Sequence, residues 1–529
     1  MRTSPVSSAD MTLVPPVDTS QDTVAHGGAE TPAAGRLRAF LRTHWLFETL
    51  LLAGLALRVV TWLAYQPALL YTDSYRYLDN IGPEDPRFLD PIGYSLFVLK
   101  PLVAIDGIQL VSIVQHIAGL AMAVLVYRIA LKLGARRWLA ALATAPVLLD
   151  AYQVQIEQNV LTDVWLQVLL VLLVWFLVGK GVPAIGWVAL AGLTVGLAMT
   201  IRMVAISTIV PVALYVVLVG RQWRVPGGWK KIAARFGALA ACFLVVVGAY
   251  ATYFHSKAGY WGLSTASGNS LYGRTAEIAD CSKLDLDPVL TQLCPKQPLG
   301  QRLGSNYYAH LDGDDPNWPG YVPPGQTKYD LDRAFAKRVV AKQPVAVGLA
   351  MLEDFGKGFL PYHFNLPGDP PTWLWQFSKT MPVFTVDPLA AQVNVFEQTN
   401  AYALKYGGKP LTLNAPLAAF LHYYQFGGYT PGPILLAALV LGLIGGWSRR
   451  GRRSGLAGVT LLITGLAFTV LATAAVFEFS WRYQLPGLVL LPLAGALGLS
   501  ALRKGKQPPA EEDPPAEEEP PVSPAPAAG

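Results

Sequence analysis

Charged residues are scarce in this chain. Only 14% of its 529 residues are Asp, Glu, Lys or Arg, whereas 53% are hydrophobic. A soluble domain usually carries about 25% charged residues, so this composition excludes an ordinary soluble protein. The basic residues gather in a few loops rather than on one face, so the net charge of +6 does not indicate a nucleic-acid partner.

Cysteine is scarcer still. Cys242, one of three cysteines, lies inside an apolar run and is expected to be a small buried hydrophobic residue. Cys281 and Cys294 fall in a segment that we place outside the membrane, where a disulfide between them is predicted. No His and Cys residues have the spacing of a metal site, so no metal or other cofactor is expected.

Long apolar runs are abundant, and several approach the roughly 20 residues that cross a bilayer. They predict an all-α polytopic membrane protein with about ten transmembrane helices. The predicted spans cover residues 45–65, 111–133, 138–150, 160–178, 182–200, 205–219, 236–253, 433–447, 456–476 and 485–502.

Basic residues set the orientation of these spans. Arg36, Arg38 and Arg42 precede the first span, and the positive-inside rule keeps such residues in the cytoplasm. With ten spans, every strongly basic short loop falls on this same side. The sequence therefore predicts a multi-pass protein of the plasma membrane.

The spans divide the chain into five parts. The segment between spans seven and eight is expected to be a mixed α/β or irregular domain, with a helix at Asp330–Lys342, and AYQVQIEQN (151–159) is expected to be an outer loop. The predicted parts are a disordered cytoplasmic tail over 1–40, a transmembrane module over 41–254 with a first outer loop at 66–106, an extracytoplasmic domain over 255–428, the last transmembrane helices over 429–503, and a disordered acidic, Pro-rich cytoplasmic tail over 504–529.

The first outer loop contains the stretch LYTDSYRYLD, in which Asp73 stands among tyrosines that include Tyr75 and Tyr77. A carboxylate at the outer membrane face can take a proton from an incoming hydroxyl group. Asp73 is therefore the candidate general base, with the two tyrosines in supporting roles. The alternative is that Asp73 caps a surface helix that starts at Ser74.

Three arginines interrupt or border apolar runs near the outer boundary. Arg58 lies about two turns inside span one, Arg202 joins spans five and six, and Arg482 precedes span ten. Arginine is always charged and can grip phosphate oxygens through two hydrogen bonds, so these residues are candidate phosphate contacts. Alternatively, Arg58 could extend to the lipid headgroups, while Arg202 and Arg482 could be interfacial anchors.

Further polar residues lie at the same boundary. His116 is in the outer turns of span two, Asp163 begins span four and Glu478 precedes span ten. We expect these three to support the site or its acceptor. The alternatives are a hydrogen-bonded helix–helix contact for His116 and a helix cap for Asp163.

Four segments resemble a known class of membrane enzymes. They are ALRVVTWLAYQPALLYTDSYRYL, VQHIAGLAMAVLVYRIALKLGA, GLTVGLAMTIRMVAISTIVP and FEFSWRYQLPGLVLLPLAG. In this order they are similar to segments of the GT-C glycosyltransferases that use polyprenyl-phosphate sugars, such as protein mannosyltransferases and the lipid A aminoarabinose transferase. The resemblance covers about the first 255 and the last 100 residues.

This resemblance implies that 41–254 is a catalytic module with Asp73 as the base and Arg58, Arg202 and Arg482 as contacts to the donor phosphate. Ser74 follows Asp73 where many members have a second acid, so a divalent metal is not favoured. The expected reaction moves a sugar from a polyprenyl-phosphate donor to an extracytoplasmic glycan, glycolipid or protein of the cell envelope, with inversion. A transporter or flippase of lipid-linked sugars and a non-catalytic scaffold stay open as alternatives.

Overall fold

The computed structural model describes residues 32–82, 89–179, 181–264, 267–311, 321–384 and 394–504. Residues 1–31 of the predicted N-terminal tail and 505–529 of the acidic tail lie outside this range. The chain divides into two compact units, Met1–Trp45 and Leu46–Gly529. Helix α1 begins within the first unit, and all contacts described below lie within the second.

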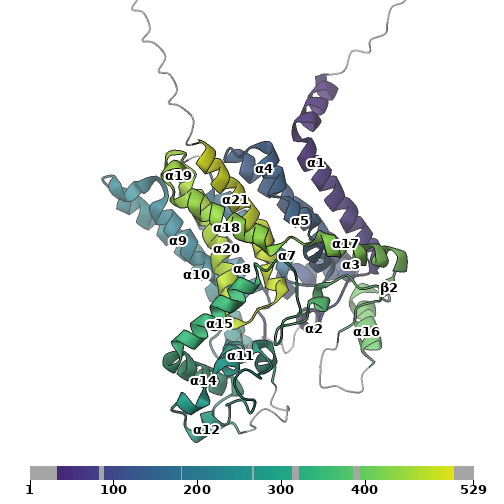
Figure 1. Cartoon of the computed structure of the whole chain (residues 1–529), viewed down its shortest axis with the longest axis vertical. Helices are drawn as coiled ribbons and strands as arrows, with labels where there is room; N and C mark the ends of the chain where they lie inside the picture. Colours follow the sequence, from purple (N-terminus) through teal and green to yellow (C-terminus); the bar gives the residue numbers. More distant parts are fainter. Residues whose placement is uncertain are drawn as a thin grey trace, which may run out of the picture. The chain divides into compact units, whose positions relative to one another are not determined.

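Between residues 32 and 258, the described part of the chain folds mostly into apolar helices (Figure 1). Their elements are α1 (Pro32–Ala64), β1 (Tyr65–Gln66), α2 (Thr72–Asp79), η1 (Ser95–Leu99), α3 (Lys100–Lys132), α4 (Arg137–Leu142), α5 (Ala145–Leu149), α6 (Ala151–Gln158), α7 (Asp163–Leu177), α8 (Ile185–Ile201), η2 (Met203–Thr208), α9 (Ile209–Leu218), η3 (Val219–Arg224) and α10 (Gly228–Ala258).

The rest of the chain adds short helices and then three long apolar ones. Figure 1 shows α18, α20 and α21 side by side. The elements are α11 (Ser267–Ile278), η4 (Cys281–Lys283), α12 (Pro288–Thr291), α13 (Ser305–Ala309), α14 (Lys328–Lys342), α15 (Pro344–Lys357), η5 (Thr372–Trp375), α16 (Val395–Gly407), β2 (Thr412–Leu413), α17 (Ala415–Gly428), α18 (Gly432–Trp447), α19 (Arg449–Arg453), α20 (Ala457–Phe477), η6 (Trp481–Gln484) and α21 (Leu485–Lys504).

The chain is a polytopic membrane protein, and each of the ten predicted span ranges contains a helix. In the described residues, five helices are long and apolar enough to cross a membrane, or up to seven if each of two bent pairs is one span. The helices over Asp163–Leu177, Ile185–Ile201 and Met203–Leu218 are apolar but shorter. Ten spans therefore stay a prediction.

The structure differs from the prediction at the start of α1 and over residues 151–159. Helix α1 begins at Pro32, inside the predicted tail, because its first turns contain the good helix formers Ala, Leu and Arg. The first outer loop, predicted over 66–106, contains helix from Ser95 onward, and α3 bends at the predicted end of this loop, Asp106–Gly107, where Gly107 has φ +68°. The segment 151–159 is mostly the helix α6, buried in the bundle, because its amides find partners there.

The segment predicted as a mixed α/β or irregular domain is mainly helical where it is described. Its strand β2 has two residues and pairs antiparallel with β1, with Leu413 opposite Tyr65. The predicted helix at Asp330–Lys342 forms as α14, starting two residues earlier behind a Thr327 cap. Cys281 and Cys294 form a disulfide, the pairing expected from their positions, beside a small core that includes Phe335.

Candidate active site

Three carboxylates and three guanidinium groups alternate in space and form what we call the acid–arginine network. Each carboxylate contacts at least one arginine, and each arginine contacts at least one carboxylate. In spatial order its members are Asp90, Arg76, Asp73, Arg482, Asp163 and Arg202. Formal charges in this set balance, which is how buried charges are usually stabilised.

Asp73 lies between two arginines. Its Oδ1 accepts a hydrogen bond from Nη2 of Arg76 at 2.7 Å, and its Oδ2 accepts one from Nη1 of Arg482 at 2.6 Å. Burial by itself would raise the pKa of Asp73, but the charges of Arg76 and Arg482 outweigh it and hold this pKa well below its usual range. Tyr71, not Asp73, occupies the N-cap position of α2, so the carboxylate does not cap the helix.

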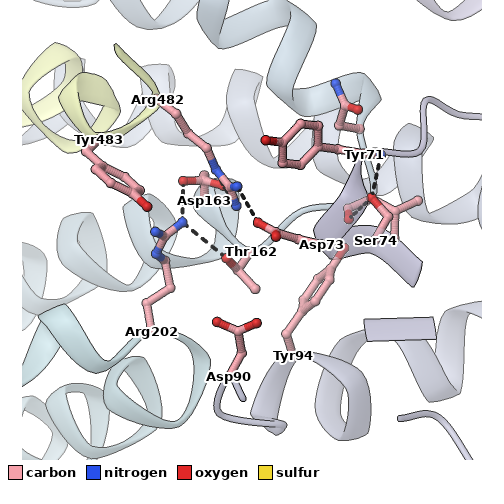
Figure 2. Close-up of polar contacts among 12 residues, drawn as sticks. Tyr71, Asp73, Ser74, Asp90, Tyr94, Thr162, Asp163, Arg202, Arg482 and Tyr483 are labelled. Carbon is pink, nitrogen blue, oxygen red and sulfur yellow. Dashed lines mark hydrogen bonds and ion pairs between the residues drawn. The ribbon is translucent and has the colours of Figure 1, made fainter. Parts of the chain in front are cut away.

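Asp163 lies between Arg482 and Arg202, as Figure 2 shows. Its Oδ1 accepts from Nη1 of Arg202 at 2.7 Å, and its Oδ2 accepts from Nε of Arg482 at 2.7 Å. Nη1 of Arg202 also lies 3.4 Å from Oγ1 of Thr162. Thr162, not Asp163, occupies the N-cap position of α7, and the oxygens of Asp163 accept from the arginines.

Backbone pairing holds the two aspartates close together. The backbone N–H of Leu69 donates to the carbonyl of Gln158, and that of Val160 donates to the carbonyl of Leu69, both at 3.0 Å. Oγ of Ser74 then donates to the carbonyl of Val160 at 2.9 Å. The start of α2 and the segment that leads into α7 are thus fixed in register, which sets the separation of their two acids.

Aromatic rings cover the arginines. The guanidinium of Arg482 lies 5.3 Å from the ring of Trp375, and that of Arg202 lies 5.3 Å from the ring of Tyr483. Trp375 also packs against Tyr71, with ring centroids 4.4 Å apart. Nε1 of Trp375 is buried and has no hydrogen-bond partner among the described residues.

A narrow cavity adjoins Tyr483. Glu478 also lines it, and the hydroxyl of Tyr483 donates to Oε1 of Glu478 at 2.6 Å. The rest of the wall is largely apolar and comes from helices α15, α18, α20 and α21, with Phe355, Phe359, Leu435, Leu471 and Leu491 among its residues.

Arg58 does not belong to the network, contrary to the prediction. Its Nη2 pairs with Oε1 of Glu157 at 2.7 Å, and the remaining hydrogen bonds go to the carbonyls of Gly54, Val147 and Leu148. Its side chain is only 2% exposed, so it does not extend to the headgroups either. Glu157 lies on α6, and as the countercharge it keeps the guanidinium within the bundle.

His116 also contacts Glu157. This is the hydrogen-bonded helix–helix contact predicted as the alternative for His116. Its Nδ1 lies 3.0 Å from Oε2 of Glu157, and its Nε2 lies 2.8 Å from Oε1 of Gln158. We call Arg58, His116 and Glu157 the Glu157 cluster. This cluster joins α1, α3 and α6. Its member Glu157 directly precedes Gln158, whose carbonyl accepts a hydrogen bond from Leu69.

The two tyrosines that follow Asp73 serve packing. The hydroxyl of Tyr75 bonds to Oγ1 of Thr399 at 2.7 Å and to the carbonyl of Phe384 at 2.9 Å. Tyr77 is buried and packs edge-on against Tyr94, with ring centroids 5.4 Å apart. Both side chains therefore fix α2 rather than present a hydroxyl group to a substrate.

Sequence reasoning missed Arg76, Asp90 and Glu157. Arg76 follows Asp73 by three residues, the spacing at which two side chains meet on a helix, so that signal was present. Nε and Nη2 of Arg76 reach Oδ2 of Asp90 at 3.3 and 2.9 Å. No local pattern could have linked Glu157 to Arg58, because the two residues lie on different helices.

The described residues contain no group of three or more His, Cys, Asp or Glu side chains that could hold a metal ion. That the reaction needs no metal stays a prediction from the sequence.

Comparison with known proteins gives one match. Residues 110–263 match the family model described as dolichyl-phosphate-mannose-protein mannosyltransferase, a stretch that contains Asp163 and Arg202 but neither Asp73 nor Arg482. Neither the curated proteins nor the solved structures give a significant match. Over residues 110–263 the chain is therefore similar to the protein mannosyltransferases, a family of the GT-C glycosyltransferase superfamily, and the resemblance seen in its sequence motifs is confirmed.

Proposed function

We propose that this membrane glycosyltransferase moves a sugar from a polyprenyl-phosphate donor to an extracytoplasmic acceptor, and that the reaction takes place at the acid–arginine network. The observation that carries this proposal is Arg482 held between Asp73 and Asp163 at 2.6 and 2.7 Å. This arrangement brings together a proton acceptor, which deprotonation of the acceptor hydroxyl needs, and a fixed positive charge, which departure of the phosphate needs.

Arg482 and Arg202 would bind the donor phosphate. In the free protein their charges are neutralised by Asp73 and Asp163. A donor phosphate would compete with these carboxylates for the guanidinium groups. The leaving phosphate gains negative charge as its bond to the sugar breaks, and prepositioned positive groups stabilise that charge in the transition state.

Asp73 would act as the base in the same step. When Arg482 turns toward the phosphate, Asp73 loses one of the two positive charges that depress its pKa, so its affinity for a proton rises. The acceptor hydroxyl gives its proton to Asp73 while its oxygen bonds to the anomeric carbon. The bond from that carbon to the phosphate oxygen breaks, and its electron pair leaves with the phosphate, which inverts the anomeric centre.

The cavity behind Tyr483 supports a lipid-linked donor. It is apolar along the spanning helices and reaches the network through Tyr483, whose ring contacts Arg202. The prenyl chain of the donor would lie along these helices, with the phosphate at the arginines. Because the basic loops place this end of the bundle outside the cytoplasm, the acceptor is an envelope glycan, glycolipid or protein.

Transfer of radiolabelled sugar tests the proposal. Purified protein in liposomes is given polyprenyl-phosphate mannose, the donor that the matched family's name suggests, or a pentose donor, together with an envelope extract. Asp73→Asn is expected to lower transfer by about 10²–10⁴-fold at unchanged protein level. Asp285→Asn changes an exposed acid of the outer segment and is expected to leave transfer unchanged.

The outcome also distinguishes the alternatives. A scaffold would give no transfer with any donor, and a flippase would move labelled lipid between leaflets without consuming it. Full transfer by Asp73→Asn would remove this residue from the role of base while leaving the protein a transferase.

A further inference from the structure

Two helices of the segment 255–428 expose apolar stripes. On α15 the stripe consists of Val345, Leu349 and Leu352, which are 73%, 62% and 67% exposed. Successive members are four and three residues apart, so they lie on one face of the helix. Large apolar side chains on a common exposed face usually mark an interaction surface.

Helix α17 carries a stripe of the same kind, this time aromatic. Phe420, Tyr423 and Phe426 are 51%, 64% and 66% exposed and lie three residues apart. Nζ of Lys379 donates to the hydroxyl of Tyr423 at 2.8 Å, which puts a positive charge at the edge of this stripe. Tyrosine and phenylalanine flanked by lysine are typical of a membrane–water interface.

The contact between α15 and α20 indicates what covers the apolar stripe of α15. Phe355 of α15 packs against Phe468 of α20, with ring centroids 5.4 Å apart. Helix α20 is a candidate membrane span that ends at Phe477, and Phe468 lies nine residues, about 14 Å, before that end. Phe355 therefore reaches into the candidate span, while the adjacent Asp354 lies near the end of that span, because Arg274 contacts both Asp354 and the carbonyl of Ala475.

Helix α17 is tied to membrane-spanning segments at its C-terminal half. The hydroxyl of Tyr424 donates to the carbonyl of Leu149, the last residue of α5. Helix α17 then bends by 47° into the apolar helix α18. The stripe of α17 therefore lies next to the end of α18, a candidate spanning segment.

We infer that α15 and α17 lie in the interface of the leaflet on the side of the acid–arginine network, with both stripes inserted among the phospholipid chains. The stripe of α15 continues the lipid-facing surface of α20, which favours lipid over a second copy of the chain as its cover. Lys342, which is exposed just before α15 begins, suits contact with headgroup phosphates.

This placement bears on the site because the two helices flank the segment that carries Trp375. The preceding helix, α15, ends at Lys357. On the other side, α17 holds Phe377 through Gln425, whose Oε1 accepts from the backbone N–H of Phe377 at 2.7 Å. The bilayer would therefore help to keep Trp375 over Arg482.

Fluorescence quenching in liposomes tests the insertion. Leu349→Cys and Tyr423→Cys are made in the full chain with Cys242→Ala, which leaves the disulfide as the other cysteine pair, and are labelled with an environment-sensitive dye. Lipids that carry a nitroxide on the acyl chain are expected to quench both labels several-fold more than a label at Leu299→Cys, and aqueous iodide is expected to show the opposite order. Leu299 is a half-exposed aliphatic residue of the outer segment and is the matched control.

Equal iodide quenching at positions 349, 423 and 299 would overturn the inference, since all three would then face water. A second copy as the cover would appear as a disulfide-linked dimer of unlabelled Leu349→Cys under oxidation, without lipid quenching, and would also overturn it. If Leu349→Cys does not fold, as judged by gel filtration, Leu352→Cys probes the same stripe. The readout is independent of sugar transfer.

Discussion

The carboxylate of Asp73 and the guanidinium of Arg482 lie 2.6 Å apart, although 409 residues separate them in the chain. Asp73 belongs to α2, near the start of the chain, and Arg482 to η6, just before the last helix. The candidate site therefore exists only when the last helices pack against the N-terminal module. Activity and correct assembly of the bundle should be lost together.

Arg482→Lys is expected to lower transfer by about 10²–10³-fold, the usual effect of removing one preorganised donor to developing charge. The guanidinium contacts Asp73 through Nη1 and Asp163 through Nε and Nη2, and a single ammonium group cannot span both acids. Arg503→Lys, on an exposed residue at the other end of α21, is the control for loss of an arginine. Equal activity of Arg482→Lys and the unsubstituted protein would show that the bridge is dispensable.

Arg58→Met is expected to destabilise the protein by about 3–5 kcal/mol, because it leaves Glu157 buried without its countercharge. The measurement is the midpoint of thermal unfolding in detergent. Adding Glu157→Gln removes the uncompensated charge while keeping an acceptor for His116, so the double variant should recover part of the loss. A double variant less stable than Arg58→Met would contradict this account of the Glu157 cluster.

Gly119→Ala is expected to lower the unfolding midpoint because a Cβ atom there would lie 2.1 Å from Oε1 of Glu157. The carboxylate cannot move away easily, since Arg58, His116 and Gln153 all hold it. Overpacking of this kind costs about 1–3 kcal/mol.

The control for this prediction is Gly248→Ala on α10, where a Cβ atom would have no neighbour within 4 Å. Alanine is also the better helix former, so this variant should be as stable as the original or slightly more so. Equal losses for the two substitutions would mean that the clash at Gly119 does not exist.

Low pH is expected to destabilise the folded protein through protonation of His363, which packs against Trp481. The ring of His363 lies among Tyr152, Tyr429 and Trp481, at centroid distances of 4.7, 4.7 and 4.2 Å. Burial lowers the pKa of His363 from 6.5 to about 4, although a hydrogen bond to Gln484 acts against it.

A histidine whose pKa is lower in the folded protein must lose its proton affinity on folding, so its contribution to stability is present above about pH 6.5 and is lost as pH falls through about 4. The limit is about 3 kcal/mol. The unfolding midpoint should therefore fall more between pH 7 and 4.5 for the original protein than for His363→Phe, which keeps the ring but does not titrate. Parallel pH profiles would exclude His363 as the cause.

Local sequence features predicted Asp73, Asp163, Arg202 and Arg482 as members of one site, and the structure brings these four together. Each interrupts or borders an apolar run, and that signal is readable because charge is costly in hydrocarbon. The same signal led to a wrong grouping for Arg58. A charged residue within a span needs a partner, but the sequence pattern does not identify that partner. For Arg58 the partner is Glu157 on α6, a segment read as a loop.

The sequence by itself determined the kind of protein: long apolar runs leave a helical bundle in a bilayer as the stable arrangement, because every backbone polar group must be satisfied within the segment. It also determined which residue types are charged near one membrane boundary. Only the tertiary structure decided which charges pair, and so divided one predicted set of arginines between the acid–arginine network and the Glu157 cluster. Ion pairs between different helices form where packing brings the side chains within a few ångströms, and distance along the chain carries no information about that separation.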